Sequence, residues 1–212
     1  MSSPESSENK QKDNIGTQVR LNIRQLFDRE SCTYTYIVQD PLSLEALIID
    51  PVIGCHERDV EALEGMGVSK LKWIANTHVH ADHVTGSARL RAHQQHKDAR
   101  TVISKASGGV ADRLLSNGDE LVIGERFIKV VSTPGHTPGC VTFVTDDNSA
   151  AFTGDALLIR GCGRTDFQGG DPAQLFDSVW TGIFSLPDTT EIWPGHDYSG
   201  RTITSVGEEK AH

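Results

Sequence analysis

Thr77-His78-Val79-His80-Ala81-Asp82-His83 is the most informative stretch of the sequence. It directly follows 71–76, an apolar run that predicts a short buried strand. Three histidines and one carboxylate therefore fall within six positions at the end of a strand, where a loop can aim several side chains at one point. Imidazole and carboxylate groups are ligands of divalent transition metals. The stretch favours a metal-binding loop over a polar loop with incidental histidines.

Three more residues of ligand type occur downstream in a similar local setting. They are His136 in 133–139 (TPGHTPG), Asp155 in 152–155 (FTGD) and His196 in 194–198 (PGHDY). Each follows a predicted strand and a glycine, where the backbone can turn and direct a side chain. Taken singly, a turn histidine, a capping aspartate and a surface histidine are the commoner interpretations. Together with the first cluster, they favour a metal site.

Composition places the chain among ordinary globular proteins. It has 212 residues, 37% hydrophobic and 23% charged, which fits one domain with a core of its own. The balance of 20 Lys+Arg against 29 Asp+Glu gives a net charge of −9. This charge argues against a nucleic-acid-binding surface or an anionic-membrane surface, because both need a positive field. No apolar run approaches the roughly 20 residues that span a bilayer.

The N-terminus and the cysteines bear on the cellular compartment. Residues 1–17 are rich in Ser, Glu, Lys and Asn and predict a disordered tail. This segment has neither the apolar region of a secretion signal nor the basic character of a transit peptide. The four cysteines are spread out and form no CxxC pair, and because no secretion signal is present, reduced thiols in the cytoplasm are the expectation. Cys140 and Cys162 are expected to be buried packing thiols, with a reactive Cys162 as the alternative.

The remaining pattern alternates between strands and helices. Strands are predicted over 18–27, 32–38, 46–50, 101–104, 120–123, 126–132, 140–145, 150–153 and 191–193. Helices are predicted over 56–66, over 83–95 with Asp82 as its cap, and from Asp171-Pro172 onward. We expect the apolar stripe of the last helix to be core. It consists of Leu175, Phe176, Val179, Trp180, Ile183 and Phe184.

HxHxDH, then GH, then GD, then a late GH, in this order, resembles the metallo-β-lactamase superfamily. The resemblance covers residues 18–212 as one domain. It implies an α/β fold with layered α and β elements, an αββα sandwich in which two sheets pack face to face with helices outside. It also implies that the site lies at one edge between the sheets.

Three segments are most similar to the persulfide dioxygenases, also called sulfur dioxygenases or ethylmalonic encephalopathy proteins. They are 31–36 (SCTYTY), 133–143 (TPGHTPGCVTF) and 152–168 (FTGDALLIRGCGRTDFQ). That resemblance implies one Fe(II) per chain, held by His78, His136 and Asp155. It leaves four positions without metal, as hydrogen-bonding partners around the ligands: His80, Asp82, His83 and His196.

The same resemblance implies a reaction. Glutathione persulfide, O2 and water give sulfite and glutathione, as a step of sulfide catabolism. Arg164 and Tyr198 line the glutathione pocket in this interpretation, although an ion pair of Arg164 with Asp166 or Asp171 is nearly as well supported. Animal members of the family are often mitochondrial, which implies the matrix as a second compartment. A homodimer is an open alternative to a monomer.

Two other functions stay open at this point. Glyoxalase II hydrolyses glutathione thioesters with two metals on the same fold, and all seven ligand positions are present here. Against it, the chain lacks that family's additional helical domain. The other alternative is an inactive truncated product, because the family usually continues past this region with an Asn-Pro-Arg stretch and a tail. The sequence stops at Lys210-Ala211-His212.

Overall fold

The computed structural model describes residues 19–212, in which two six-stranded sheets pack against each other. The predicted tail, 1–17, lies outside these residues. The first sheet contains, in spatial order, β1 (Asn22–Phe27), β2 (Tyr34–Gln39), β3 (Glu45–Ile49), β4 (Lys70–Ala75), β5 (Arg100–Ser104) and β6 (Arg113–Leu115). The second contains β12 (Thr204–Ser205), β11 (Glu191–Pro194), β10 (Ala150–Gly154), β9 (Val141–Thr145), β8 (Arg126–Ser132) and β7 (Glu120–Ile123).

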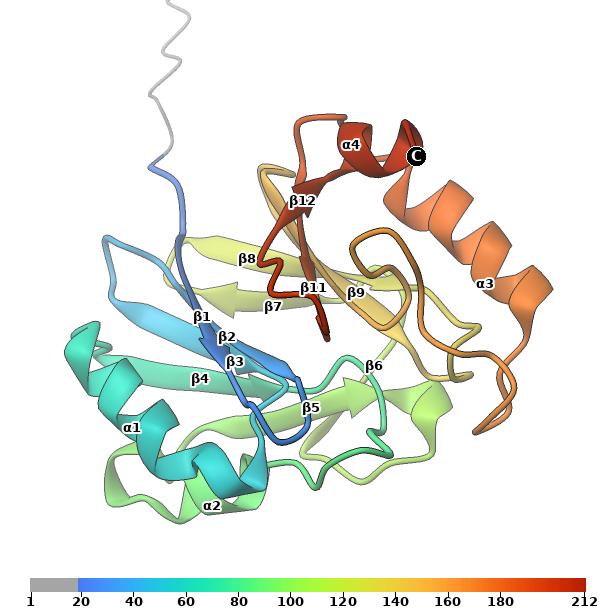
Figure 1. Ribbon diagram of the computed structural model, residues 1–212. Helices are drawn as coiled ribbons and strands as arrows, with labels where there is room; N and C mark the ends of the chain where they lie inside the picture. The colour runs from blue at the N-terminus through green and yellow to red at the C-terminus, as the bar shows by residue number, and fades with distance from the viewer. Residues whose placement is uncertain (1–18) are drawn as a thin grey trace, which may run out of the picture.

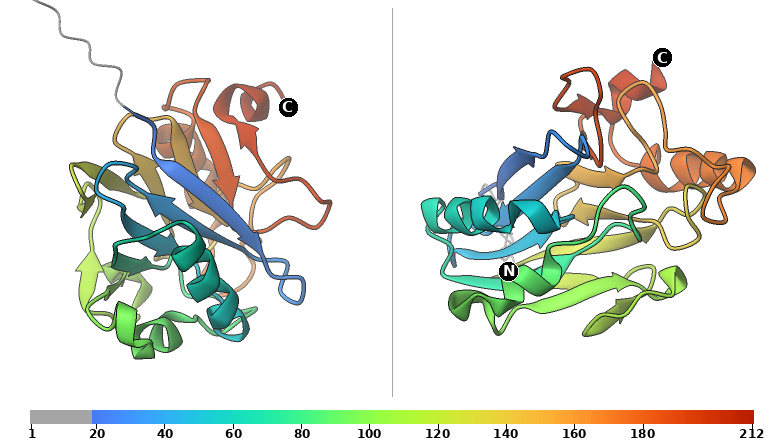
Figure 2. Two further views of the ribbon diagram at one scale, coloured as in Figure 1. Left: turned by 90° about the vertical axis from the view of Figure 1, so that its left-hand side faces the viewer. Right: turned by 60° about the horizontal axis from the view of Figure 1, so that its bottom comes forward.

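Helices cover the outer faces of the two sheets (Figure 1). They are α1 (His56–Gly65), α2 (Ser87–Ala92), α3 (Pro172–Ser178) and α4 (Val206–Lys210). The views of Figure 2 show α1 and α2 together on the side of the first sheet and α3 on the opposite side. This is the predicted αββα sandwich, and the fold class is confirmed.

The period of two along each strand explains the layers. In β2, Tyr36 and Val38 point into the core between the sheets, where they join Phe143 and Phe152 of the second sheet. Ile37 lies between them in sequence and points outward, into a separate core beneath α1 and α2. A third core packs beneath α3. Strands buried on both faces therefore read as continuous apolar runs.

Two of the predicted helices differ from the structure. The helix predicted over 83–95 spans only Ser87–Ala92, and Gly86, not Asp82, is its N-cap. Asp82 does not cap this helix because its carboxylate accepts hydrogen bonds from His83 and Thr33 instead. A 3₁₀ turn over Gln94–His96 follows.

The last predicted helix begins where expected, since Asp171 accepts hydrogen bonds from the amides of Ala173 and Gln174. It then continues as a π-helical turn over Val179–Ile183. The expectation that its whole apolar stripe is core is wrong. Phe176 is 62% exposed and Trp180 is 53% exposed, because the buried arc takes only Leu175, Val179 and Ile183.

Candidate metal centre

Four loops meet at one edge of the sandwich, each at the carboxyl end of a strand. They follow β4, β8, β10 and β11 and carry the seven ligand-type residues of the sequence. One strand belongs to the first sheet and three to the second. Backbone hydrogen bonds join the loops, from Val141 N to Thr77 O and from Gly195 N to Gly154 O. The pairing of the sheets therefore brings together residues that lie more than a hundred positions apart in sequence.

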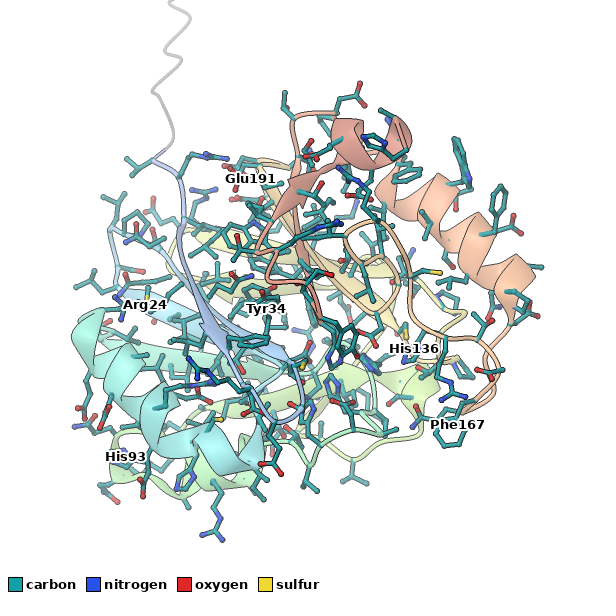
Figure 3. The ribbon with its side chains drawn as sticks, viewed as in Figure 1. Arg24, Tyr34, His93, His136, Phe167 and Glu191 are labelled. Atoms are coloured by element: carbon teal, nitrogen blue, oxygen red, sulfur yellow. The ribbon has the colours of Figure 1, made fainter. Side chains whose placement is uncertain are left out.

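The three predicted ligands form one group. One ligand atom from each of His78, His136 and Asp155 lies within 4.8 Å of the others. Nε2 of His136 is 3.6 Å from Oδ2 of Asp155. The rings of His78 and His136 have centroids 4.9 Å apart and are nearly perpendicular. All three side chains are largely buried, and Figure 3 shows His136 between the two sheets near the strand ends.

His78 is oriented by a relay that ends on Asp50. The Thr77 hydroxyl donates to Oδ2 of Asp50 at 2.8 Å, so the Thr77 oxygen is left to accept from Nδ1 of His78 at 2.9 Å. The proton of His78 is therefore on Nδ1, and Nε2 keeps its lone pair for a ligand. Burial and the neighbouring His80 hold the pKa of His78 well below its usual range, so the ring is the neutral, ligating form.

The other histidines of the site follow the same pattern. Nδ1 of His136 donates to the carbonyl of Arg164 at 2.7 Å, and Nδ1 of His196 donates to the carbonyl of Cys32 at 3.2 Å. Nδ1 of His83 donates to Asp82 at 2.8 Å, and Nε2 of His80 donates to Asp50 at 3.0 Å. Each ring thus has one nitrogen fixed by an acceptor and one left over, which is the usual arrangement of metal-binding histidines.

Asp155 is a buried carboxylate without a cationic side chain of its own. Among residues 19–212, its ion-pair partners are only the imidazoles of His136 and His196, each 3.6 Å away. Its Oδ1 is buried and accepts no hydrogen bond within the described part of the chain. Burial raises the pKa of Asp155, although the two imidazoles oppose this. A divalent cation would supply the missing positive charge, and these residues fit one.

Asp50 anchors the loop after β4. It is fully buried and accepts from the Thr77 amide at 2.7 Å in addition to the Thr77 hydroxyl and His80. Burial opposes its ionisation, but His80 and the Thr77 amide outweigh burial and hold the pKa of Asp50 at about 2. Asp50 is therefore an anion that fixes both the relay to His78 and the ring of His80. Sequence reasoning described Asp50 only as the end of a strand.

A second group of ligand atoms lies beside the first. His80, Asp82 and His83 each contribute one atom, again within 4.8 Å of one another. Nδ1 of His80 and Nε2 of His83 are buried and accept or donate no hydrogen bond within residues 19–212. His196 lies between the two groups, with Nε2 3.6 Å from Asp155 and 3.7 Å from Asp82. The geometry alone thus has room for a second ion.

Two glycines allow the loops to approach this closely. A Cβ on Gly163 would lie 2.7 Å from Nδ1 of His136 and 2.6 Å from the carbonyl oxygen of Asp155. A Cβ on Gly195 would lie 2.6 Å from Oδ1 of Asp155. Real side chains do not pack this closely, so glycine is required at both positions. Through Gly163, residues 161–164 (GCGR), here called the GxGR segment, are therefore part of the support of the metal centre.

A pocket of about 360 Å³ opens beside the ligands. Its lining includes His136, Asp155, Cys162, Arg164, Phe167 and Tyr198. Arg164 makes a bidentate ion pair with Asp166, at 2.8 and 3.0 Å, and both side chains are exposed. The ring of Tyr198 stacks on His196 with centroids 6.1 Å apart. The structure therefore places both predicted substrate-binding residues at the mouth of the pocket, with Arg164 held by Asp166.

The two cysteines expected to be buried differ. Cys140 is buried, as predicted, and burial raises its pKa to about 11. Cys162 is exposed at the pocket wall, so the expectation of a packing thiol is wrong there. The surroundings are locally open, since a Cβ on the neighbouring Gly161 would have nothing within 4 Å.

Known proteins resemble this chain over most of its length. Residues 30–196 match the model of the metallo-beta-lactamase superfamily. The mitochondrial persulfide dioxygenase ETHE1 of Bos taurus is 48% identical over 92% of this chain and 76% of its own. The crystal structure of ETHE1 from Myxococcus xanthus superposes with a TM-score of 0.84 at 44% identity, covering 90% of this chain and 82% of that one.

Hydrolases of the same superfamily are less similar. A hydroxyacylglutathione hydrolase of Brucella ovis is 38% identical over 85% of this chain and 67% of its own. Both similarities are consistent with the site, since the two kinds of enzyme share the fold. The higher identity and the larger coverage belong to the dioxygenases, and the chain belongs to the metallo-beta-lactamase superfamily and, within it, to the persulfide dioxygenase family.

Proposed function

We propose that this chain oxidises glutathione persulfide with O2 and water to sulfite and glutathione, using one Fe(II) held by His78, His136 and Asp155. The observation that carries the proposal is the 48% identity to a persulfide dioxygenase over 92% of the chain. The site supports it with two imidazoles and one carboxylate gathered within 4.8 Å. This ligand composition is that of non-haem Fe(II) oxygenases, which leave coordination positions open.

The polypeptide prepares the centre in three ways. Thr77 and the Arg164 carbonyl fix the rings of His78 and His136 so that each offers its Nε2. Burial of Asp155 without a Lys or Arg partner in the described chain leaves a carboxylate that gains most from a bound cation. When bound, Fe(II) supplies the redox chemistry that allows O2 to react with the substrate sulfur.

The pocket residues bind and orient the substrate. The guanidinium of Arg164 offers a carboxylate of glutathione a charged, bidentate partner, which compensates locally for the net charge of −9. Tyr198 and His196 line the same pocket and offer a phenol and an imidazole for proton exchange with the substrate or with water. His80, Asp82 and His83 surround the centre as hydrogen-bonding partners without metal.

A two-metal glutathione thioester hydrolase is the rival, because the His80–Asp82–His83 group offers a second set of ligands. The two functions differ in metal count and in the need for O2. Oxygen uptake is therefore measured with glutathione persulfide as substrate, together with a sulfite assay and metal analysis of anaerobically purified protein. We expect sulfite, O2 uptake and one iron per chain.

Two variants distinguish one bound metal ion from two. His136→Ala is expected to abolish iron binding, since the proposed iron centre has only three protein ligands, whereas His83→Ala is expected to keep most of the iron. Two zinc ions per chain, one of them lost in His83→Ala, together with thioester hydrolysis without O2 uptake, would establish the rival. Stable iron binding with neither activity would favour an inactive product.

The compartment stays a prediction. The relative from Bos taurus is named as mitochondrial, whereas the cytoplasmic expectation depends on residues 1–17, which lie outside the described structure. None of the helices between residues 19 and 212 has the length and apolar character needed to cross a bilayer. Fractionation of cells that express the untagged chain tests the two compartments, and light scattering tests the homodimer.

A further inference from the structure

A second pair of histidines lies outside the metal centre. His96 ends the 3₁₀ turn over Gln94–His96 that replaces the end of the predicted helix, and His93 directly precedes this turn with extended backbone. The two imidazole rings nevertheless lie side by side. The backbone is fixed on both sides, since His96 N donates to His93 O at 2.9 Å and Ala99 N donates to His96 O at 2.9 Å.

The two rings carry unusual unsatisfied polar atoms. His96 is 5% exposed, and neither of its ring nitrogens has a hydrogen-bond partner within residues 19–212. Nδ1 of His93 is also buried and without a partner in that range. A buried polar atom that loses water without a replacement costs free energy. Three such atoms on two neighbouring rings make this position a candidate site for a ligand of imidazole nitrogen.

The geometry of the pair suits a metal ion. The ring centroids are 5.4 Å apart and the planes differ by 33°. An ion bound at about 2.1 Å from one nitrogen of each ring lies roughly 3 Å from each centroid, so two rings on one ion have centroids about 5–6 Å apart. Burial and the neighbouring His93 lower the pKa of His96, which leaves the neutral, ligating ring.

An acidic side chain lies in the electrostatic neighbourhood of the pair. Glu64, near the end of α1, is exposed and close enough to His96 to interact with it electrostatically. Figure 3 shows His93 beside α1, away from His136. The pair therefore belongs neither to the candidate iron centre nor to the substrate pocket.

We propose that His93 and His96 form a peripheral site for a late divalent transition ion, of the kind of Zn²⁺ or Cu²⁺, with water as further ligands and Glu64 as a nearby negative charge. Imidazole nitrogen is a donor that these ions accept. A bound ion would bridge the two rings and give one nitrogen of each ring a partner. This proposal does not depend on the catalytic activity.

The test uses the iron-loaded full chain and counts bound Cu²⁺ or Zn²⁺ by equilibrium dialysis. His96→Gln and His93→Gln are each compared with the parent and with His56→Gln. His56 is a partly buried histidine on α1 whose Nδ1 pairs with the Ile53 carbonyl, which makes it a matched control. Any ion bound at His80–Asp82–His83 is common to all four proteins and cancels in the comparison.

We expect both test variants to lose one equivalent of the added ion and His56→Gln to lose none. Glu64→Gln should weaken the same binding step while preserving both imidazoles. In electron paramagnetic resonance of the Cu²⁺-loaded proteins, the difference between the parent and each test variant should be one component with two nitrogen donors, since any Cu²⁺ at His80–Asp82–His83 contributes to both spectra. Circular dichroism and iron content identify a variant that fails to fold. Because His93 is only partly buried, His93→Gln should disturb folding less than His96→Gln. Unchanged stoichiometry in a folded His93→Gln protein, or an equal loss in His56→Gln, would overturn the proposal.

Discussion

Replacing Asp50 by Asn tests whether the candidate centre depends on a residue that touches no proposed metal ligand atom directly. The substitution preserves shape but removes the charge. In the parent, the carboxylate accepts from the Thr77 amide, the Thr77 hydroxyl and Nε2 of His80. The amide of Asn offers one acceptor oxygen, so at least one of these donors loses its partner. The relay that orients His78 then loses its terminal anion.

The size of the effect follows from the pKa. A carboxyl whose pKa falls from 3.8 to about 2 on folding contributes about 2 kcal/mol of stability at neutral pH. Because the folded-state pKa is depressed, this contribution is fully present above pH 4 and is lost as the pH falls through about 2. Loss of charge-assisted hydrogen bonds gives a similar figure, about 1.5–3 kcal/mol. Iron affinity should fall about 10- to 100-fold, as expected for a residue that orients a ligand.

Urea unfolding of metal-free protein at several pH values measures the stability, and a chelator competition measures the iron affinity. The gap between parent and Asp50→Asn should be about 2 kcal/mol at pH 7 and should narrow below pH 4. Asp59→Asn is the control. Asp59 is also buried, but burial raises its pKa, and it lies on α1 paired with Arg58. That variant should keep the iron affinity of the parent. Equal stability and equal iron affinity for Asp50→Asn and the parent would refute the reasoning.

Two further substitutions test the GxGR segment. Gly163→Ala introduces a Cβ 2.6–2.7 Å from atoms of Asp155 and His136, so it should lower the free energy of unfolding by about 1–3 kcal/mol and weaken iron binding. Gly161→Ala, whose Cβ would have nothing within 4 Å, should leave both quantities unchanged when they are measured by urea unfolding and iron titration. Arg164→Ala should raise KM for glutathione persulfide about 10- to 100-fold in oxygen-electrode kinetics and leave the melting temperature nearly unchanged, because its exposed ion pair with Asp166 contributes little stability. Asp166→Asn removes the ion-pair partner of the Arg164 guanidinium and should not raise KM. If Arg164→Ala instead lowers the melting temperature and leaves KM unchanged, Arg164 has a structural role.

The sequence predicted the fold where local pattern and overall architecture agree. The alternation in β2 sends Tyr36 and Val38 to one core and Ile37 to another, so strand period alone indicates a layered sheet. The ordered ligand motifs and the 152–168 segment predicted the superfamily and the dioxygenase family, and both are confirmed. The three proposed ligands were expected in one place, and the strand ends bring them within 4.8 Å.

Predictions that depend on one side chain were less accurate where that side chain could take either of two roles in the structure. Asp82 has the chemistry of a helix cap, yet its carboxylate is engaged by His83 and Thr33, so the helix begins later. Phe176 and Trp180 fit an apolar helical stripe, yet the sheet beneath α3 covers only the arc of Leu175, Val179 and Ile183. Pattern identifies the apolar face of a helix but not the width of the surface that covers it.

Asp50 shows why the support of the centre was the part that sequence could not reveal. Its partner Thr77 lies 27 residues away, and only the parallel pairing of β3 with β4 makes them neighbours. That pairing sets Ile49 opposite Ala75 and lets the Asp50 amide donate to the Ala75 carbonyl at 2.9 Å, so the next residues along both strands meet. A shift in that register would move Asp50 away from Thr77 and leave His78 without its relay. The motifs of a sequence identify the ligand residues of such a site. The orientation of their ligand atoms depends on strand register, which a single sequence does not determine.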